Sequence, residues 1–125
     1  MNIYFFWAAT FMSIVTFSVH TFIGGPLVAG PLLADTHLPE ASRWLNYYCW
    51  HVTTIFTLAM GGGYAYVALH PERPELVVFL TLVTAAASIL SAAVAIKGHI
   101  HPLRFPSTSL FAVVSLLGFL GLVSA

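Results

Sequence analysis

Residues 76–96, LVVFLTLVTAAASILSAAVAI, decide the fold, because this stretch contains no charged side chain over its whole length. An α-helix needs about 20 consecutive apolar residues to cross the hydrocarbon core of a bilayer. Strands of a membrane β-barrel are about half as long and alternate apolar with polar residues. The stretch therefore predicts a membrane-spanning helix.

Three further apolar stretches of similar length cover residues 3–23, 45–69 and 107–125. The chain is 59% hydrophobic and only 6% charged, whereas about a quarter of the residues in a soluble domain are charged. Because lipid cannot hydrogen-bond to exposed backbone groups, helices are the expected elements. We predict an all-α integral membrane four-helix bundle that forms a single transmembrane domain over residues 1–125. No Lys or Arg precedes the first stretch, so we expect a retained helix and not a signal peptide.

Charge and cysteine content exclude several classes of protein. The formal net charge is zero, which argues against a nucleic-acid partner. The single cysteine, Cys49, excludes an internal disulfide framework. None of the four stretches contains Asp or Glu, which argues against a carboxylate-based transporter. The expected partners are the lipid bilayer and, as alternatives, a second copy that packs through Gly118 and Gly121 or a larger membrane complex.

Glycines and prolines mark the predicted connections. We expect Gly24-Gly25-Pro26 to end the first helix, and Pro26, Gly30 and Pro31 to prevent a long helix in the apolar segment 27–38. That segment is expected to lie at the interface or to fold back on the bundle. Four passes place both termini on one membrane face with the turn at 70–75, and the other two connections on the opposite face. Arg43, Lys97 and Arg104 lie on that opposite face, so the positive-inside rule predicts that the termini are outside the cell.

Five of the six histidines fall on the face that holds the first and third connections: His20, His37, His51, His99 and His101. At about 100° per residue, His20 lies on a stripe of small and hydroxylated side chains that includes Thr10, Ser13, Thr16 and Gly24. His51 lies on a similar stripe with Thr54, Thr57 and Gly61. Such stripes let membrane helices pack closely. We therefore expect His20 and His51 to point into the bundle at matching depth.

Paired imidazoles at membrane depth favour a ligand site, because ionisable groups there are costly and imidazole is a common ligand of haem iron and transition metals. We predict a histidine-lined site near one membrane face that binds haem b or a transition-metal ion for electron transfer or metal handling. His20 and His51 are the predicted cofactor ligands. His99 and His101 are predicted to join them as metal ligands, and Asp35 or Glu40 would supply oxygen. Cys49 is expected to point away from His51.

Other interpretations of the same residues stay open. The chain is alternatively a structural accessory subunit of a larger membrane complex. A third hypothesis is a small membrane enzyme or transporter, with unknown catalytic residues, in which histidines act as acid and base near neutral pH. A histidine near a helix end also serves simply to hydrogen-bond a hydroxyl or carbonyl of a neighbouring helix. His37 is expected to be solvated, and His70 to end a helix.

The strings HTFIGG at residues 20–25 and YYCWHVTT at residues 47–54, with His101-Pro102 and the Gly- and Leu-rich last stretch, resemble small four-helix proteins of bacterial inner membranes. These proteins have no characterised activity. The resemblance spans most of the chain and implies a bacterial inner-membrane location. It assigns no functional residue.

Overall fold

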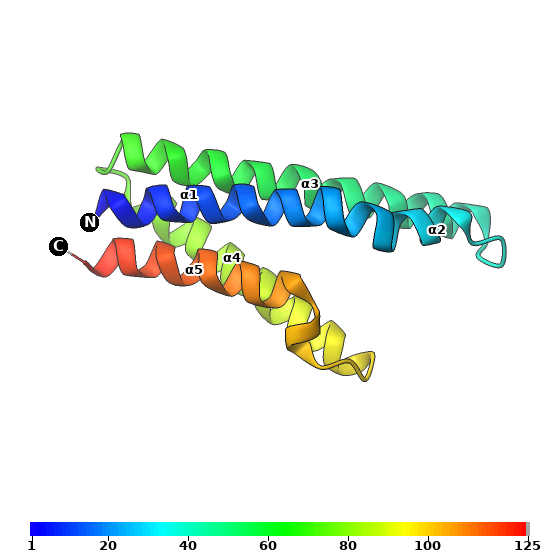
Figure 1. Ribbon diagram of the computed structural model, residues 1–125. Helices are drawn as coiled ribbons and strands as arrows, with labels where there is room; N and C mark the ends of the chain where they lie inside the picture. The colour runs from blue at the N-terminus through cyan, green and yellow to red at the C-terminus, as the bar shows by residue number, and fades with distance from the viewer. Residues whose placement is uncertain (125) are drawn as a thin grey trace.

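The structure, a computed structural model, describes residues 1–124 and shows four long helical segments, with no strand in that range. They are Ile3–Ala34, Glu40–Leu69 (α3), Pro74–Lys97 (α4) and Pro106–Val123 (α5). All four are long and apolar enough to cross a membrane. The all-α four-helix bundle predicted from the sequence is confirmed, and its composition is that of a multi-pass membrane protein (Figure 1).

The first helical segment continues well past Gly24-Gly25-Pro26, so the predicted end of the helix there is wrong. It consists of an α-helix, Ile3–Ser18 (α1), an eleven-residue π-helix, Val19–Ala29 (η1), and a short α-helix, Gly30–Ala34 (α2). In the wider π turn the backbone N–H of Gly30 donates to the carbonyl of Gly25, five residues earlier. Proline removes one donor and crowds the preceding turn of an α-helix. A local change to the wider hydrogen-bonding register accommodates such an interruption without ending the helix.

A short connection replaces the long loop expected between the first two spans. Oδ1 of Asp35 accepts hydrogen bonds from the backbone N–H groups of His37 at 2.7 Å and Leu38 at 3.3 Å. The side chain of Arg43, in the first turns of α3, donates to the carbonyl oxygen of Asp35 at 3.1 Å. These bonds fold residues 35–39 into a tight turn, so α3 begins at Glu40, five residues before the predicted start.

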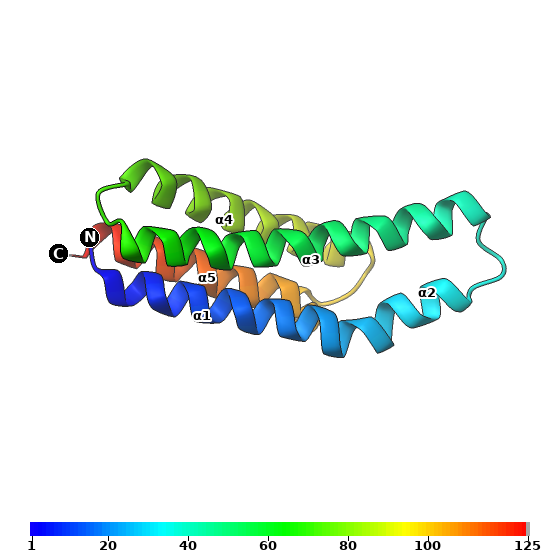
Figure 2. The same cartoon turned by 90° about the horizontal axis from the view of Figure 1, so that it is seen from above.

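The arrangement of the ends follows from the four passes. Both termini and the α3–α4 turn lie at one end of the bundle, which we call the terminal end (Figures 1 and 2). The α2–α3 turn and the α4–α5 connection point the other way, and we call that side the loop end. The predicted placement of the two faces relative to the termini is therefore confirmed.

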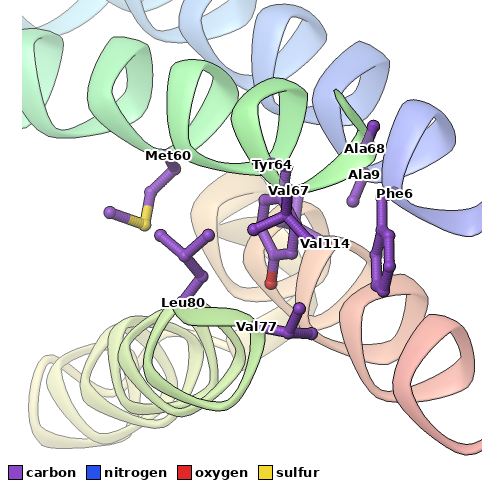
Figure 3. Close-up of a cluster of buried hydrophobic side chains, with 9 residues drawn as sticks. All are labelled: Phe6, Ala9, Met60, Tyr64, Val67, Ala68, Val77, Leu80 and Val114. Carbon is purple, nitrogen blue, oxygen red and sulfur yellow. The ribbon is translucent and has the colours of Figure 1, made fainter. Parts of the chain in front are cut away.

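The hydrophobic core lies toward the terminal end (Figure 3) and consists of Phe6, Ala9, Met60, Tyr64, Val67, Ala68, Val77, Leu80 and Val114. Gly118 and Gly121 of α5 are buried against it. A Cβ at Gly118 would overlap the hydroxyls of Tyr64 and Thr81, and one at Gly121 would overlap the ring of Phe6. These two glycines pack within the bundle, so the prediction that they form a dimer face is wrong.

The two helix pairs separate toward the loop end. α1 packs on α3 and α4 packs on α5, and the pairs spread apart with distance from the termini (Figure 1). α3 has 30 residues and α5 has 18, so at a rise of 1.5 Å per residue they are about 45 Å and about 27 Å long. Hence α2 and the first turns of α3 extend past the start of α5 (Figures 1 and 2).

Hydroxyl groups join α4 to α5 along the length of the two helices. Oγ of Ser91 lies 2.7 Å from Oγ of Ser107 and 2.8 Å from Oγ1 of Thr108. Ser88 donates to the carbonyl oxygen of Thr108 at 2.7 Å, and Ser115 donates to that of Thr81 at 3.1 Å. The hydroxyls of Thr10, Ser13 and Thr16 on α1 are also buried, as predicted, but they bond to carbonyls of their own helix. Hydrogen bonds therefore connect α4 to α5, whereas the hydroxyls of α1 bond within their own helix and α1 packs on α3 through van der Waals contacts.

Candidate functional site: a cavity at the loop end

A cavity of about 490 Å³ lies between the two helix pairs, in the half of the bundle away from the core. Ligand sites in proteins commonly have volumes of about 300 to 1,000 Å³. One wall comes from α1, η1 and α3, and the other from η2 (Pro102–Arg104), Phe105 and the first turns of α5. The lining is mostly apolar, and its polar or charged side chains are Thr16, His20, Trp50, Thr53, Thr57, Arg104 and Ser107.

His20 is the only histidine on the cavity wall within residues 1–124, and its ring is held by α3. Nε2 lies 3.1 Å from the carbonyl oxygen of Trp50 and 3.2 Å from Oγ1 of Thr54. A carbonyl oxygen only accepts hydrogen bonds, so the bond to Trp50 requires the proton of the ring to be on Nε2. In the neutral ring, Nδ1 then keeps a lone pair that can accept a hydrogen bond or bind a metal ion.

The indole of Trp50 completes this wall. Its ring stacks on the imidazole of His20, with centroids 3.9 Å apart and planes inclined by 21°. A Cβ placed at Gly24 would come within 2.7 Å of the indole ring, whereas one at Gly25 would meet nothing within 4 Å. Gly24 is therefore the residue that lets Trp50 lie against η1 and over His20. The wall is a three-residue unit formed by His20, Trp50 and Gly24.

His51 does not face His20 across the bundle. It is exposed, is absent from the cavity lining, and packs its ring against Tyr47 at a centroid distance of 4.6 Å. Successive residues on a helix differ by about 100° in direction, so placing Trp50 inward turns His51 outward. The predicted inward orientation of His51 is wrong, while that of Thr57 and Gly61 on the same helix is confirmed.

The other predicted ligands lie outside the cavity and are involved in local structure. His99 is exposed and has a positive φ of 56° where α4 ends. His101 is exposed, and its Nδ1 accepts from the backbone N–H of Leu103 at 3.3 Å, which caps η2. Asp35 caps the α2–α3 turn, and Glu40 and Cys49 are exposed and absent from the lining.

Within residues 1–124, no group of three or more His, Cys, Asp or Glu side chains is placed to hold a metal ion. Five of the six histidines share the loop end of the bundle as predicted, but sharing an end does not bring their rings together. Ligation of haem or a metal by His20 and His51 stays a prediction from the sequence.

Sequence reasoning overlooked two members of the site, Trp50 and Arg104. The sequence pattern gave Trp50 no role in the site and used Arg104 only to orient the chain. A signal for Trp50 was available, because Trp50, Thr53 and Thr57 have the i, i+3, i+7 spacing of one helix face. The position of Arg104 depends on the irregular η2 segment, for which no periodic signal exists.

Comparisons with protein families, with curated proteins and with solved structures found no match for this chain. The site is therefore interpreted from its own geometry.

Proposed function

We propose that this membrane protein binds a small, largely apolar molecule in the loop-end cavity, with the wall formed by His20, Trp50 and Gly24 as its recognition surface. The observation that carries the proposal is the cavity itself, whose volume and apolar lining with a few polar groups suit a ligand. The terminal end is packed by large core side chains and close glycine contacts. At the loop end no comparable core fills the space between the helix pairs, and an occupant of the cavity would supply that packing.

The chemistry of the wall favours an organic ligand over a metal centre. Nε2 of His20 is already bonded to Trp50 and Thr54, which leaves Nδ1 as the free position on the ring. A metal ion at Nδ1 would need further ligands, and among the described residues the lining contains no Asp, Glu, Cys or second His. An organic ligand needs only a hydrogen-bond donor for Nδ1 and an apolar surface for the remaining walls.

Solvent extraction of the purified protein, followed by mass spectrometry, tests the proposal. Wild type is expected to carry a co-purified small molecule that Leu110→Trp holds in much lower amount, because Leu110 lines the cavity and the larger indole would narrow it. Leu58→Trp is the matched control, since Leu58 is 51% exposed and outside the lining. Equal amounts of the molecule in both variants, or none in wild type, would contradict the proposal.

A visible absorption spectrum of the same sample distinguishes the occupants. An organic ligand is expected to leave the protein without a haem absorption band. A haem band that His20→Ala abolishes would instead support the ligation predicted from the sequence. A partner protein at fixed stoichiometry, with no small molecule, would favour the accessory-subunit hypothesis.

A further inference from the structure

The cavity combines an apolar interior with one charged side chain, Arg104. Its apolar lining includes Val19, Ile23, Leu27 and Val28 on one side and Leu110 and Phe111 on the other. Within residues 1–124, Arg104 is the only charged residue that lines it, and no Asp or Glu does. The ion pairs within residues 1–124 join His70 to Glu72 and Arg73 to Glu75, so Arg104 has no acidic partner there.

An anionic group would complement this arrangement. The guanidinium of arginine is permanently charged and presents a planar set of donors that fits a carboxylate or a phosphate. Arg104 ends η2, directly before Phe105 and the start of α5, so its charge lies at the loop end of the cavity, where an interfacial headgroup would be. The apolar walls then extend from that charge toward the middle of the bundle.

We infer that the ligand is an anionic amphiphile, whose carboxylate or phosphate binds Arg104 and whose acyl chain fills the cavity beside Trp50. This inference rests on the proposed function and adds the chemical class of the ligand. A membrane lipid with net negative charge and a free fatty acid share this chemistry. The other cations of the loop end provide a contrast, because Arg43 and Lys97 do not line the cavity and Arg43 already bonds to the turn at Asp35.

Quenching of Trp50 by brominated acyl chains tests the inference. Trp7→Phe and Trp44→Phe leave Trp50 as the only tryptophan, and both replaced side chains are exposed, at 44% and 53%. The protein is reconstituted in phosphatidylcholine vesicles that contain a low fraction of a brominated probe. The probe is phosphatidylcholine, phosphatidylglycerol or a free fatty acid with the same brominated chain.

The anionic probes are expected to associate about fivefold more strongly than brominated phosphatidylcholine, in line with the strength of a solvent-accessible ion pair. Whichever anionic probe associates more strongly, phosphatidylglycerol or the free fatty acid, identifies the preferred headgroup. Arg104→Gln should reduce the preference to about one and Arg104→Lys should largely retain it, while Arg43→Gln and Lys97→Gln should leave it unchanged. Arg104 is exposed, so these variants keep the fold.

Two results would overturn the inference. Equal association of the three probes with wild type would exclude an anion site while leaving a cavity that accepts apolar chains. An equal loss of preference in Arg104→Gln and Lys97→Gln would assign the effect to general surface charge. If Leu110→Tyr, which narrows the cavity without adding a second tryptophan, fails to reduce quenching by any probe, the cavity is not occupied and the proposed function fails as well.

Discussion

The two ends of this bundle use similar residues in different ways. At the terminal end, Gly118 and Gly121 are buried and bring α5 close to the aromatic rings of Tyr64 and Phe6. At the loop end, Gly24 likewise receives the aromatic ring of Trp50, but the opposite helix pair lies farther away and a cavity remains. Close glycine–aromatic contacts therefore build a packed core at one end and one wall of a pocket at the other. The two ends differ in whether the other helix pair packs directly against the glycine–aromatic contact.

The largest effect is expected at the terminal end. Gly121→Ala places a methyl group against the ring of Phe6, which is fully buried. Overpacking of this kind lowers the free energy of unfolding by about 1–3 kcal/mol. Gly62→Ala is the control, because a Cβ there meets nothing within 4 Å. Reversible unfolding in mixed micelles measures both, and equal stability of the two variants would show that the terminal end is not tightly packed.

A smaller effect is expected from the same change at the loop end. Gly24→Ala moves the indole of Trp50, which is partly exposed and has the cavity beside it. We expect a loss of stability below about 1 kcal/mol, since such a side chain can relax, together with a several-fold loss of ligand. Gly25→Ala should retain the ligand. Ligand content and the emission maximum of Trp50 measure the difference, and identical results for the two alanine variants would contradict the assigned role of Gly24.

The hydroxyl bonds between α4 and α5 should contribute modestly. Ser91→Ala removes the contacts to Ser107 and Thr108, and hydrogen bonds between membrane helices are worth about 0.6 kcal/mol on average. Ser109 bonds only to the carbonyl of Pro106 in its own helix, so Ser109→Ala is the matched control. The same unfolding assay compares them. A larger loss for Ser109→Ala would show that these bonds do not hold the loop end of the α4–α5 pair together.

The smallest effect is expected at His51, which is compared with His20. His20→Ala removes the contacts of Nε2 with α3, and hydrogen bonds between membrane helices contribute about 0.6 kcal/mol on average. His51→Ala changes an exposed side chain and should stay within about 0.5 kcal/mol of wild type. Unfolding and ligand content of the two variants test this order. If both variants lost the ligand to the same large extent, the result would support the pair of ligands, His20 and His51, that the sequence predicts.

The large-scale fold was predictable because it depends on quantities that a sequence shows directly. Four apolar stretches of sufficient length predict four membrane-spanning helices, and the number of passes determines which connections lie at the same end of the bundle. The helix boundary at Gly24-Gly25-Pro26 was not predictable in this way, because a proline that normally ends an α-helix lies within a π-helix here. Local propensity does not reveal such a change of register.

The site depended on finer detail than the fold. Whether Trp50 or His51 faces inward is a choice between neighbouring residues about 100° apart, and hydroxyl stripes do not fix the helix phase that accurately. The histidine pattern correctly identified the end of the molecule that carries the cavity. It misassigned the partner of His20, because the neighbouring Trp50 carbonyl, a backbone group, accepts the bond. Backbone acceptors have no signature in a sequence.

Native mass spectrometry of the intact protein, released from detergent, tests the central claim most directly. We expect one bound small molecule per chain in wild type and in Leu58→Trp, and a much smaller bound fraction in Leu110→Trp, whose indole narrows the cavity. A wild-type spectrum with only the mass of the bare chain, or a bound mass that Leu110→Trp retains in full, would contradict it.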